Sequence, residues 1–190
     1  MTALEIVLIR HGEQIRHPGD PGLSHDGVRS AQRAAAQLTR EPATALYTSP
    51  LRRAAETAAV IGTAVGLPVT PDPRLAERMN WGPEHYRDFE HFLAEWRRCA
   101  EDRHHRPPDG DSSAEAGRRM LEFLDGLPAA AGPVLAVTHG GIVVDLLREL
   151  FGDVEVRRLG RDLISDGVPH CSLTTLVRGS AGFRVSGVGR

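Results

Sequence analysis

Two imidazoles and two guanidiniums lie where predicted buried strands end or on the first turn of the helix that follows such a strand. They belong to Arg10, His11, Arg53 and His139. Arg10 and His11 directly follow the apolar run 4–9. His139 closely follows the apolar run 133–137. Because open α/β sheets bind ligands beyond the carboxyl ends of their strands, we expect these side chains to meet in one crevice. Guanidinium forks match the oxygens of a dianionic phosphoryl group, so the set suits phosphate better than a metal ion.

Two predicted helices begin beside the same crevice. Thr138-His139-Gly140-Gly141 runs from a predicted strand into a helix, which places free backbone N–H groups and the positive end of a helix dipole next to the imidazole. Ser49-Pro50 offers an N-cap hydroxyl followed by proline at the first helical position, and Arg53 lies on the first turn. A bound phosphoryl group would therefore meet backbone donors as well as charged side chains.

This combination of groups predicts a chemical route as well as a ligand. A neutral imidazole is nucleophilic near neutral pH, and covalent capture of the phosphoryl group by histidine divides its transfer into two steps. Expelling an alkoxide then requires a proton donor, for which we choose Glu77, because a carboxyl near bound phosphate keeps its proton more readily. The scheme needs neither a metal ion nor a cofactor. The pair His104-His105 has no partner at ligand spacing, so we expect no metal site.

The elements that must position these residues alternate along the chain. Short apolar runs predict strands and longer segments of helical period predict helices, which is typical of an α/β domain. The predicted strands cover 4–9, 43–47, 133–137, 173–177 and 183–188, and the predicted helices cover 24–38, 50–65, 84–103, 113–127 and 142–151. We expect a three-layer α/β/α sandwich with a mostly parallel sheet and an antiparallel edge strand. The breaker-rich stretch 104–112 predicts a loop and a candidate lid.

Length and composition set the frame for this prediction. The chain has 190 residues, so a single domain over 1–190 is the natural expectation. Its 23 basic and 25 acidic side chains leave a formal net charge of −2, which argues against nucleic acid as a partner. All the basic residues are arginine. The lack of lysine excludes a Walker-type phosphate lysine, a Schiff base and a pyridoxal phosphate anchor.

The same composition predicts where the protein works. A hydrophobic fraction of 41% is ordinary for a globular chain, and no apolar run approaches the roughly 20 residues that span a bilayer. We therefore expect a cytoplasmic protein without a membrane partner, and a homodimer as the commonest default assembly. Cys99 and Cys171 lack the spacing of a metal pair and are too few for a disulfide framework.

Four motifs in sequence order resemble the histidine phosphatase superfamily, also called phosphoglycerate mutase-like. They are Arg10-His11-Gly12-Glu13, Ser49-Pro50-Leu51-x-Arg53-Ala54-x-Glu56-Thr57-Ala58, Leu75-x-Glu77 and Thr138-His139-Gly140-Gly141, with Leu23-Ser24-x-x-Gly27 as a further match. Each motif alone is weak, but together they span roughly residues 4 to 150. The resemblance implies the phosphoglycerate mutase-like fold and a nucleophilic His11. It also implies a phosphate clamp of Arg10, Arg53 and His139 with the Gly140 amide, and Glu77 as proton donor and later base for water.

Three positions near these motifs depart from the family pattern. The asparagine that commonly follows the nucleophile by six residues is His17 here, and the loop after Glu77 reaches glycine one residue late, at Gly82. Where many members have Gly-Glu-Ser, this chain has Gly110-Asp111-Ser112, and we expect Asp111 to be peripheral. We expect Gln14, His17 and Arg78 to contact the substrate, and Trp81 to lie near it.

The sequence thus predicts a phosphatase that hydrolyses a small phosphomonoester through phosphohistidine. Two alternatives stay open. A phosphoglycerate mutase would use the same histidine but return the phosphoryl group to another hydroxyl, although the motif His139-Gly140-Gly141 resembles phosphatase members more closely. A non-catalytic module would retain the pocket and bind phosphate ligands without turnover. The sequence does not select a substrate, because specificity lies in loops.

Overall fold

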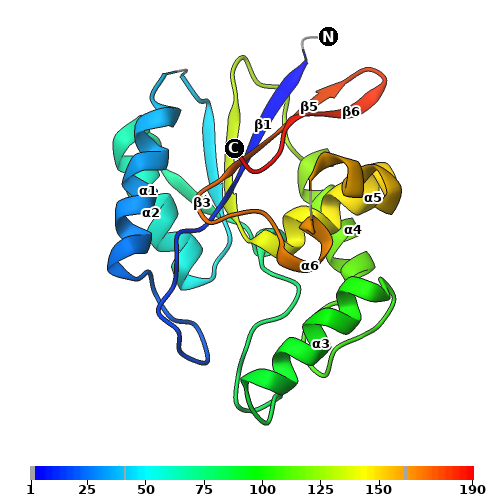
Figure 1. The fold of residues 1–190 in the computed structure, drawn as a ribbon. Helices are drawn as coiled ribbons and strands as arrows, with labels where there is room; N and C mark the ends of the chain where they lie inside the picture. The colour runs from blue at the N-terminus through cyan, green and yellow to red at the C-terminus, as the bar shows by residue number, and fades with distance from the viewer. Residues whose placement is uncertain (1–2, 41, 161) are drawn as a thin grey trace.

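The fold was obtained as a computed structural model that describes residues 3–40, 42–160 and 162–190. One sheet of six strands lies between two helical layers (Figure 1). The strands are β1 (Leu4–Arg10), β2 (Ala45–Thr48), β3 (Val69–Pro71), β4 (Val134–Thr138), β5 (Leu173–Gly179) and β6 (Gly182–Gly187). The helices are α1 (His25–Leu38), α2 (Arg52–Val65), η1 (Pro73–Leu75), α3 (Phe89–Glu101), α4 (Ser113–Asp125), α5 (Gly140–Leu159) and α6 (Leu163–Asp166).

The strand order β3-β2-β4-β1-β5-β6 confirms a mostly parallel sheet. β1, β2 and β4 are parallel neighbours, and Arg10 pairs with Thr138 while Thr48 pairs with Val137. Their carboxyl ends therefore lie side by side, as the strand-end motifs required. β5 runs antiparallel to β1, but it lies second from the edge because it forms a hairpin with β6. The expected antiparallel edge strand is present as β6, which pairs antiparallel with β5, and the turn to β6 uses Gly182 at φ 107°.

Each face of the sheet carries its own apolar cluster. Ile6, Leu8 and Ala136 pack towards α4 and α5, where Met120 and Leu146 are completely buried. On the opposite face Val7, Ile9 and Val137 pack towards α1 and α2, where the contacts come from Ala35, Ala54, Ala58 and Ile61. Because both faces are covered, the central strands read as continuous apolar runs in the sequence.

Most predicted elements form, and the differences have local causes. β3 was missed because it has only three residues, Val-Thr-Pro, which are too few to form an apolar run. The helix predicted over 84–103 begins at Phe89, because Asp88 caps it by accepting a hydrogen bond from the His91 amide at 2.7 Å. The helix predicted to end at 151 kinks at Gly152 and continues to Leu159. The capping box of Ser112 and Glu115 is present as predicted.

The start of α2 corrects a predicted cap. Ser49 does not serve as the N-cap, since α2 begins at Arg52. The Arg52 amide donates instead to the Asp20 carboxylate at 2.9 Å and 3.0 Å, while the Ser49 hydroxyl faces His139. The Asp20 carboxylate therefore caps α2 in place of the Ser49 hydroxyl, and it lies at the positive end of the helix dipole.

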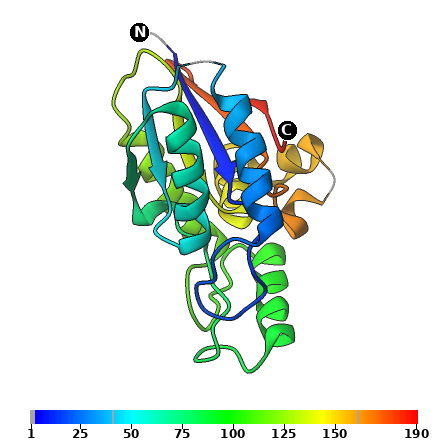
Figure 2. The ribbon, with the colours of Figure 1, turned by 90° about the vertical axis from the view of Figure 1, so that its left-hand side faces the viewer.

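Helix α3 stands apart from the layered body. Figures 1 and 2 show it beyond the end of the sheet at which the strands β1 and β4 terminate. A small third cluster of Met79, Tyr86 and Cys99, with Trp81, Phe92 and Trp96 against it, attaches this helix and the segment before it. The predicted loop 104–112 forms as part of an irregular segment, 102–112, between α3 and α4. The segment 79–101 therefore faces the strand ends across the crevice.

Candidate active site

His11 sits at the end of β1 with only 4% of its surface exposed. Its Nδ1 atom lies 2.7 Å from the Gly12 carbonyl oxygen. Because a carbonyl only accepts hydrogen bonds, Nδ1 carries the proton and Nε2 keeps its lone pair. Arg53 Nε donates to this Nε2 at 3.2 Å. Burial, followed by the charge of Arg53, lowers the pKa of His11 well below its ordinary value, so the ring is neutral near pH 7.

The backbone next to His11 has no room for a side chain. A Cβ atom on Gly12 would lie 2.6 Å from the carbonyl oxygen of Gly27 on α1. The Gly12 amide donates to the Thr57 hydroxyl on α2 at 3.0 Å, so β1, α1 and α2 all hold this turn. The requirement for glycine explains why the residue after the histidine is part of the motif.

Arg53 reaches the site from the first turn of α2. Its side chain is 5% exposed, whereas that of Arg52 is 65% exposed and pairs with Glu56. Arg53 Nη1 donates to Asn80 Oδ1 at 3.2 Å and lies 3.8 Å from Asp20. Arg53 is thus the arginine that faces His11, as the motif predicted. Burial lowers its pKa, with Glu77 acting in the opposite direction.

Arg10 completes the basic side of the site. Its Nη1 donates to the Val168 carbonyl, and its guanidinium lies close against the first residue of α5, since a Cβ atom on Gly140 would come within 3.0 Å of Arg10 Cζ. Burial lowers the Arg10 pKa from its ordinary value, partly offset by Glu77. Arg10 Nε is buried without a hydrogen-bond partner among the described residues.

His139 lies behind His11 and is completely buried. The two ring centroids are 4.9 Å apart at an interplanar angle of 62°. His139 Nε2 lies 2.8 Å from the Ser49 hydroxyl, and within the described chain its Nδ1 has no partner. Burial and the neighbouring His11 lower the His139 pKa well below its ordinary value. The motif residue therefore reaches the site as a neutral imidazole.

Glu77 faces the same site from the segment after η1. Its carboxylate accepts hydrogen bonds from the amides of Gly141 at 2.9 Å and Ile142 at 2.8 Å, at the start of α5. The Arg78 amide donates to it as well, at 2.9 Å. Despite the extra residue after it, Glu77 lines the same cavity as His11. The extra residue lengthens the turn which carries Asn80 to Arg53.

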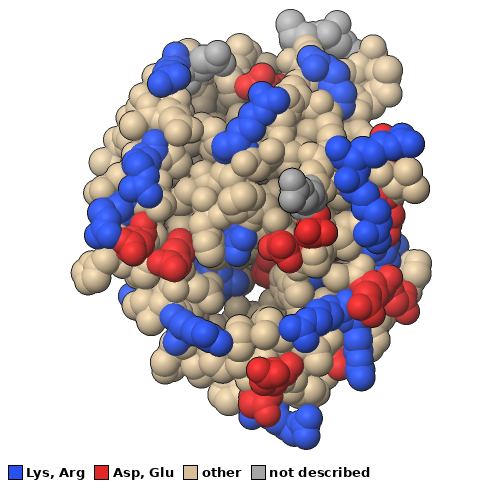
Figure 3. Space-filling model, in the orientation of Figure 1, with Lys and Arg blue, Asp and Glu red and all other residues tan. Residues whose placement is uncertain are grey.

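A cavity of about 440 Å³ joins these groups, and Figure 3 shows basic and acidic side chains around the hollow on this face. Its lining comprises Arg10, His11, Glu13, Gln14, Arg16, His17, Gly19, Arg53, Glu77, Met79, Asn80, Trp81, Phe89, Phe92, Leu93, Trp96, Asp166 and His170. The structure thus brings Gln14 and His17 to the cavity, as well as Trp81. His139 and Gly140 lie next to lining residues without lining the cavity themselves.

Arg78 corrects the expectation of a substrate contact. Its side chain is 2% exposed and donates to Asp145 on α5 at 2.9 Å and 3.0 Å. Its guanidinium stacks on the Trp96 ring at 3.7 Å from the centroid. A buried carboxylate and an aromatic face therefore hold this guanidinium away from the cavity. Asp111 pairs with Arg119 and lies outside the lining, in keeping with the peripheral place expected for it.

Among the lining residues that the sequence did not predict, Asn80 and His170 lie directly against predicted site residues. Asn80 donates to the Gly19 carbonyl at 2.6 Å while it accepts from Arg53, so it links two loops across the cavity. His170 approaches His11 to 5.6 Å between ring centroids, and burial lowers its pKa to about 4. Asn80 lies three residues after Glu77, which is the one signal in the sequence that could have indicated it. His170 has no such signal.

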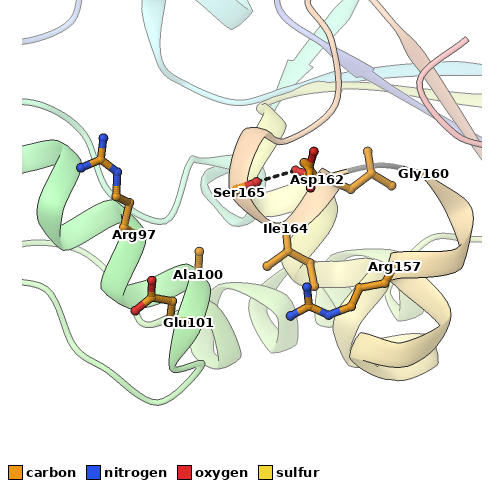
Figure 4. A pocket seen from close by; sticks show the side chains of 9 residues that line it. Arg97, Ala100, Glu101, Arg157, Gly160, Asp162, Ile164 and Ser165 are labelled. Atoms are coloured by element: carbon orange, nitrogen blue, oxygen red, sulfur yellow. Dashed lines mark hydrogen bonds between the residues drawn. The ribbon is translucent and has the colours of Figure 1, made fainter.

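A second cavity of about 440 Å³ lies between α3 and the segment around α6. Figure 4 shows Arg97 and Glu101 on one side and Arg157, Ile164 and Ser165 on the other. The imidazoles and buried guanidiniums of the first cavity are absent from its described lining. Because the two volumes are equal, the chemistry of the lining identifies the candidate active site.

Two further observations concern the whole described chain. Within residues 3–40, 42–160 and 162–190, no group of three or more histidine, cysteine, aspartate or glutamate side chains is placed to hold a metal ion. None of the described helices is long and apolar enough to cross a membrane.

Comparisons with known proteins agree with this geometry. A Yersinia enterocolitica protein named "Probable phosphoglycerate mutase GpmB" is 38% identical over 164 residues, which cover 78% of this chain and 75% of that protein. A mycobacterial glucosyl-3-phosphoglycerate phosphatase, solved with VO3, superposes with a TM-score of 0.78 at 27% identity and covers 96% of this chain and 97% of its own. A phosphoserine phosphatase from Entamoeba histolytica, with a TM-score of 0.69, 18% identity and coverage of 98% and 97%, shares the fold.

The family assignment follows from a match over nearly the whole sequence. Residues 6–189 match the model of the histidine phosphatase superfamily (branch 1), and the matched region includes every strand-end motif described above. The fold predicted from the resemblance is confirmed by the superposed structures. The chain belongs to the histidine phosphatase superfamily.

Proposed function

We propose that the protein is a phosphatase that hydrolyses a small phosphomonoester through a phosphohistidine on His11. The observation that carries this proposal is the orientation of His11, whose Nε2 keeps a lone pair within a cavity lined by Arg10 and Arg53. A neutral nucleophile between two fixed guanidiniums suits attack on a phosphoryl group, because those charges offset the charge of its oxygens.

The first half of the reaction transfers the phosphoryl group to His11. The Nε2 lone pair forms the N–P bond while the ester P–O bond breaks, and Arg10 and Arg53 bind the phosphoryl oxygens. Binding would displace the Arg53 Nε contact from Nε2, since the guanidinium then donates to the oxygens. The alkoxide that leaves takes a proton from Glu77, the one carboxyl group of the cavity that the α5 N-terminus holds directly.

The second half of the reaction hydrolyses the phosphohistidine and regenerates free His11. Glu77, now a carboxylate, takes a proton from water, and the water oxygen attacks phosphorus as the N–P bond breaks. His139 supports both halves from behind, since its unpartnered Nδ1 offers a hydrogen bond to a phosphoryl oxygen if the ring turns towards it. Inorganic phosphate and the free alcohol are the products, and the scheme uses no metal ion or cofactor.

The test is phosphate release from a panel of phosphomonoesters, run beside His11→Ala. Rapid quenching in alkali followed by mass spectrometry should detect phosphate on the peptide that contains His11, because phosphohistidine survives alkali. A chelator should leave the rate unchanged. Turnover by His11→Ala at the parental rate would refute the mechanism. Binding of phosphate ligands in calorimetry without any turnover would instead identify a binding module.

A mutase is the second candidate, favoured by the name of the Yersinia relative. It would return the phosphoryl group from His11 to a different hydroxyl. Incubation with 3-phosphoglycerate and a trace of 2,3-bisphosphoglycerate separates the two, because a mutase yields isomerised product and a phosphatase yields free phosphate. The cytoplasmic location and the homodimer stay predictions, and size-exclusion chromatography with light scattering tests the latter.

A further inference from the structure

One wall of the active-site cavity is apolar and largely aromatic. It comes from the segment after Glu77 and from α3, and it consists of Met79, Trp81, Phe89, Phe92, Leu93 and Trp96. Trp81 and Phe89 meet edge to face at 4.8 Å between ring centroids, and Phe89 stacks on Phe92 at 6.0 Å. Trp81 and Phe89 are both half-buried, so their remaining exposed surface is available to a ligand.

This wall lines the same cavity as the groups that hold the phosphoryl group. The cavity of about 440 Å³ falls in the range of roughly 300–1,000 Å³ typical of small-molecule sites, which is far more than a phosphoryl group needs. The remaining space must take the alcohol part of the ester. An alcohol with an apolar ring would remove both its own surface and that of the wall from water.

The charges of the lining restrict the alcohol further. Three guanidiniums line the cavity, from Arg10, Arg16 and Arg53, and three carboxyl groups, from Glu13, Glu77 and Asp166. With the proton on Glu77 that the first half of the reaction requires, the lining has one positive charge in excess. A dianionic phosphoryl group therefore leaves the occupied cavity with surplus negative charge. Arg16 is the one guanidinium away from the phosphoryl end, and its Cζ lies 4.6 Å above the Phe89 ring, as part of the wall. A second anionic group on the substrate would meet Glu13 and Asp166 as well.

We propose that the preferred substrates are monoesters of uncharged alcohols that carry an apolar ring, with Trp81 and Phe89 as the residues that set this preference. The inference rests on the proposed phosphatase activity and adds the class of substrate. It places phosphoglycerate, whose carboxylate adds charge and whose carbon chain has no ring, among the poor substrates.

Three esters of primary alcohols test the proposal with leaving groups of similar chemistry. 2-Phenylethyl phosphate carries the ring, glycerol 3-phosphate is polar and uncharged in its alcohol part, and 3-phosphoglycerate replaces the terminal hydroxymethyl of glycerol 3-phosphate by a carboxylate. We expect kcat/KM for 2-phenylethyl phosphate to exceed that for glycerol 3-phosphate by about tenfold or more, which corresponds to about 1.4 kcal/mol of buried apolar surface. The value for 3-phosphoglycerate should be the lowest.

Variants of the wall connect the preference to these side chains. Trp81→Ala and, separately, Phe89→Ala should lower the ratio of kcat/KM for 2-phenylethyl phosphate to that for glycerol 3-phosphate by about fivefold, mainly through KM. Trp81→Leu keeps apolar volume and should restore part of the ratio. Val154→Ala, at an exposed apolar residue of α5 that is 65% exposed, is the control and should leave the ratio unchanged.

The outcomes separate this inference from the function on which it rests. If no monoester releases phosphate, including the activated p-nitrophenyl phosphate, the proposed function itself is wrong. If phosphate is released but glycerol 3-phosphate or 3-phosphoglycerate equals or exceeds 2-phenylethyl phosphate, the substrate class is wrong while the phosphatase stands. A preference that survives both wall variants would overturn the assignment to Trp81 and Phe89. Because the comparison is a ratio within one preparation, partial loss of folded protein does not affect it.

Discussion

The Nδ1 atom of His11 lies 2.7 Å from the carbonyl oxygen of Gly12, and this single contact decides which ring nitrogen is available for reaction. The contact ties the proton to Nδ1 and points Nε2 into the cavity. Gly12 cannot be replaced without a clash with the backbone of Gly27, so the geometry of the nucleophile depends on close packing of β1 against α1.

His11→Asn should reduce turnover to background while the protein stays folded. The amide side chain matches the imidazole in size and polarity, but it provides no nucleophilic nitrogen lone pair. Phosphate release and circular dichroism, measured together, check both statements. His104→Asn, in the exposed loop, is the matched control and should retain the parental rate.

Arg53→Lys should lower kcat/KM by about 10²-fold or more, because an ammonium cannot donate to His11, Asn80 and phosphate in the planar arrangement of a guanidinium. The neighbouring Arg52→Lys supplies the control, since that side chain is 65% exposed and points away from the cavity. Equal effects of the two substitutions would contradict the assignment of Arg53.

Glu77→Gln should lower kcat by about 10²–10⁴-fold for alkyl phosphates, which need a proton on the leaving oxygen. The loss should be much smaller for p-nitrophenyl phosphate, whose leaving group departs without one. The glutamine oxygen still accepts a hydrogen bond from the α5 N-terminus, so the fold is preserved. Equal losses for both ester types would show that Glu77 does not act as the acid.

Asp145→Ala should destabilise the protein by about 3–5 kcal/mol, because it leaves the Arg78 guanidinium buried without its counter-charge. Urea unfolding measures this loss in the free energy of unfolding. The double variant Arg78→Met with Asp145→Ala should cost less than the single variant, since it removes the buried charge as well. A single variant as stable as the parent would show that this pair does not anchor the segment after Glu77 to α5.

Acid should weaken the fold through the imidazoles whose pKa values folding lowers, which are those of His11, His139 and His170. Because these pKa values are lowered, below about pH 6.5 the unfolded chain binds protons that the folded protein does not. The free energy of unfolding should therefore fall between pH 7 and pH 5, by up to about 1.4 kcal/mol per pH unit for each ring. His139→Gln should reduce the pH dependence of the free energy of unfolding. An unchanged slope in that variant would contradict the contribution of His139. Glu115, with a pKa of about 2, titrates below this range and does not contribute to the slope.

Sequence alone determined those parts of the protein that depend on neighbouring residues. Arg10 and His11 were placed because a strand must end before them, and the convergence of three motifs followed because parallel strands share one carboxyl edge. The choice between Arg52 and Arg53 required the helix phase, which the motif supplied and the exposure of the two side chains confirmed.

Tertiary structure alone decided what depends on loops and on contacts distant in sequence. Arg78 was expected at the substrate, but Asp145, 67 residues away, takes its guanidinium into the interior. Asn80 reaches Arg53 only because the turn after Glu77 folds back to Gly19. The aromatic wall likewise exists because α3 packs across the crevice. No periodicity in a sequence reports such contacts, since their energy arises only when separate segments meet.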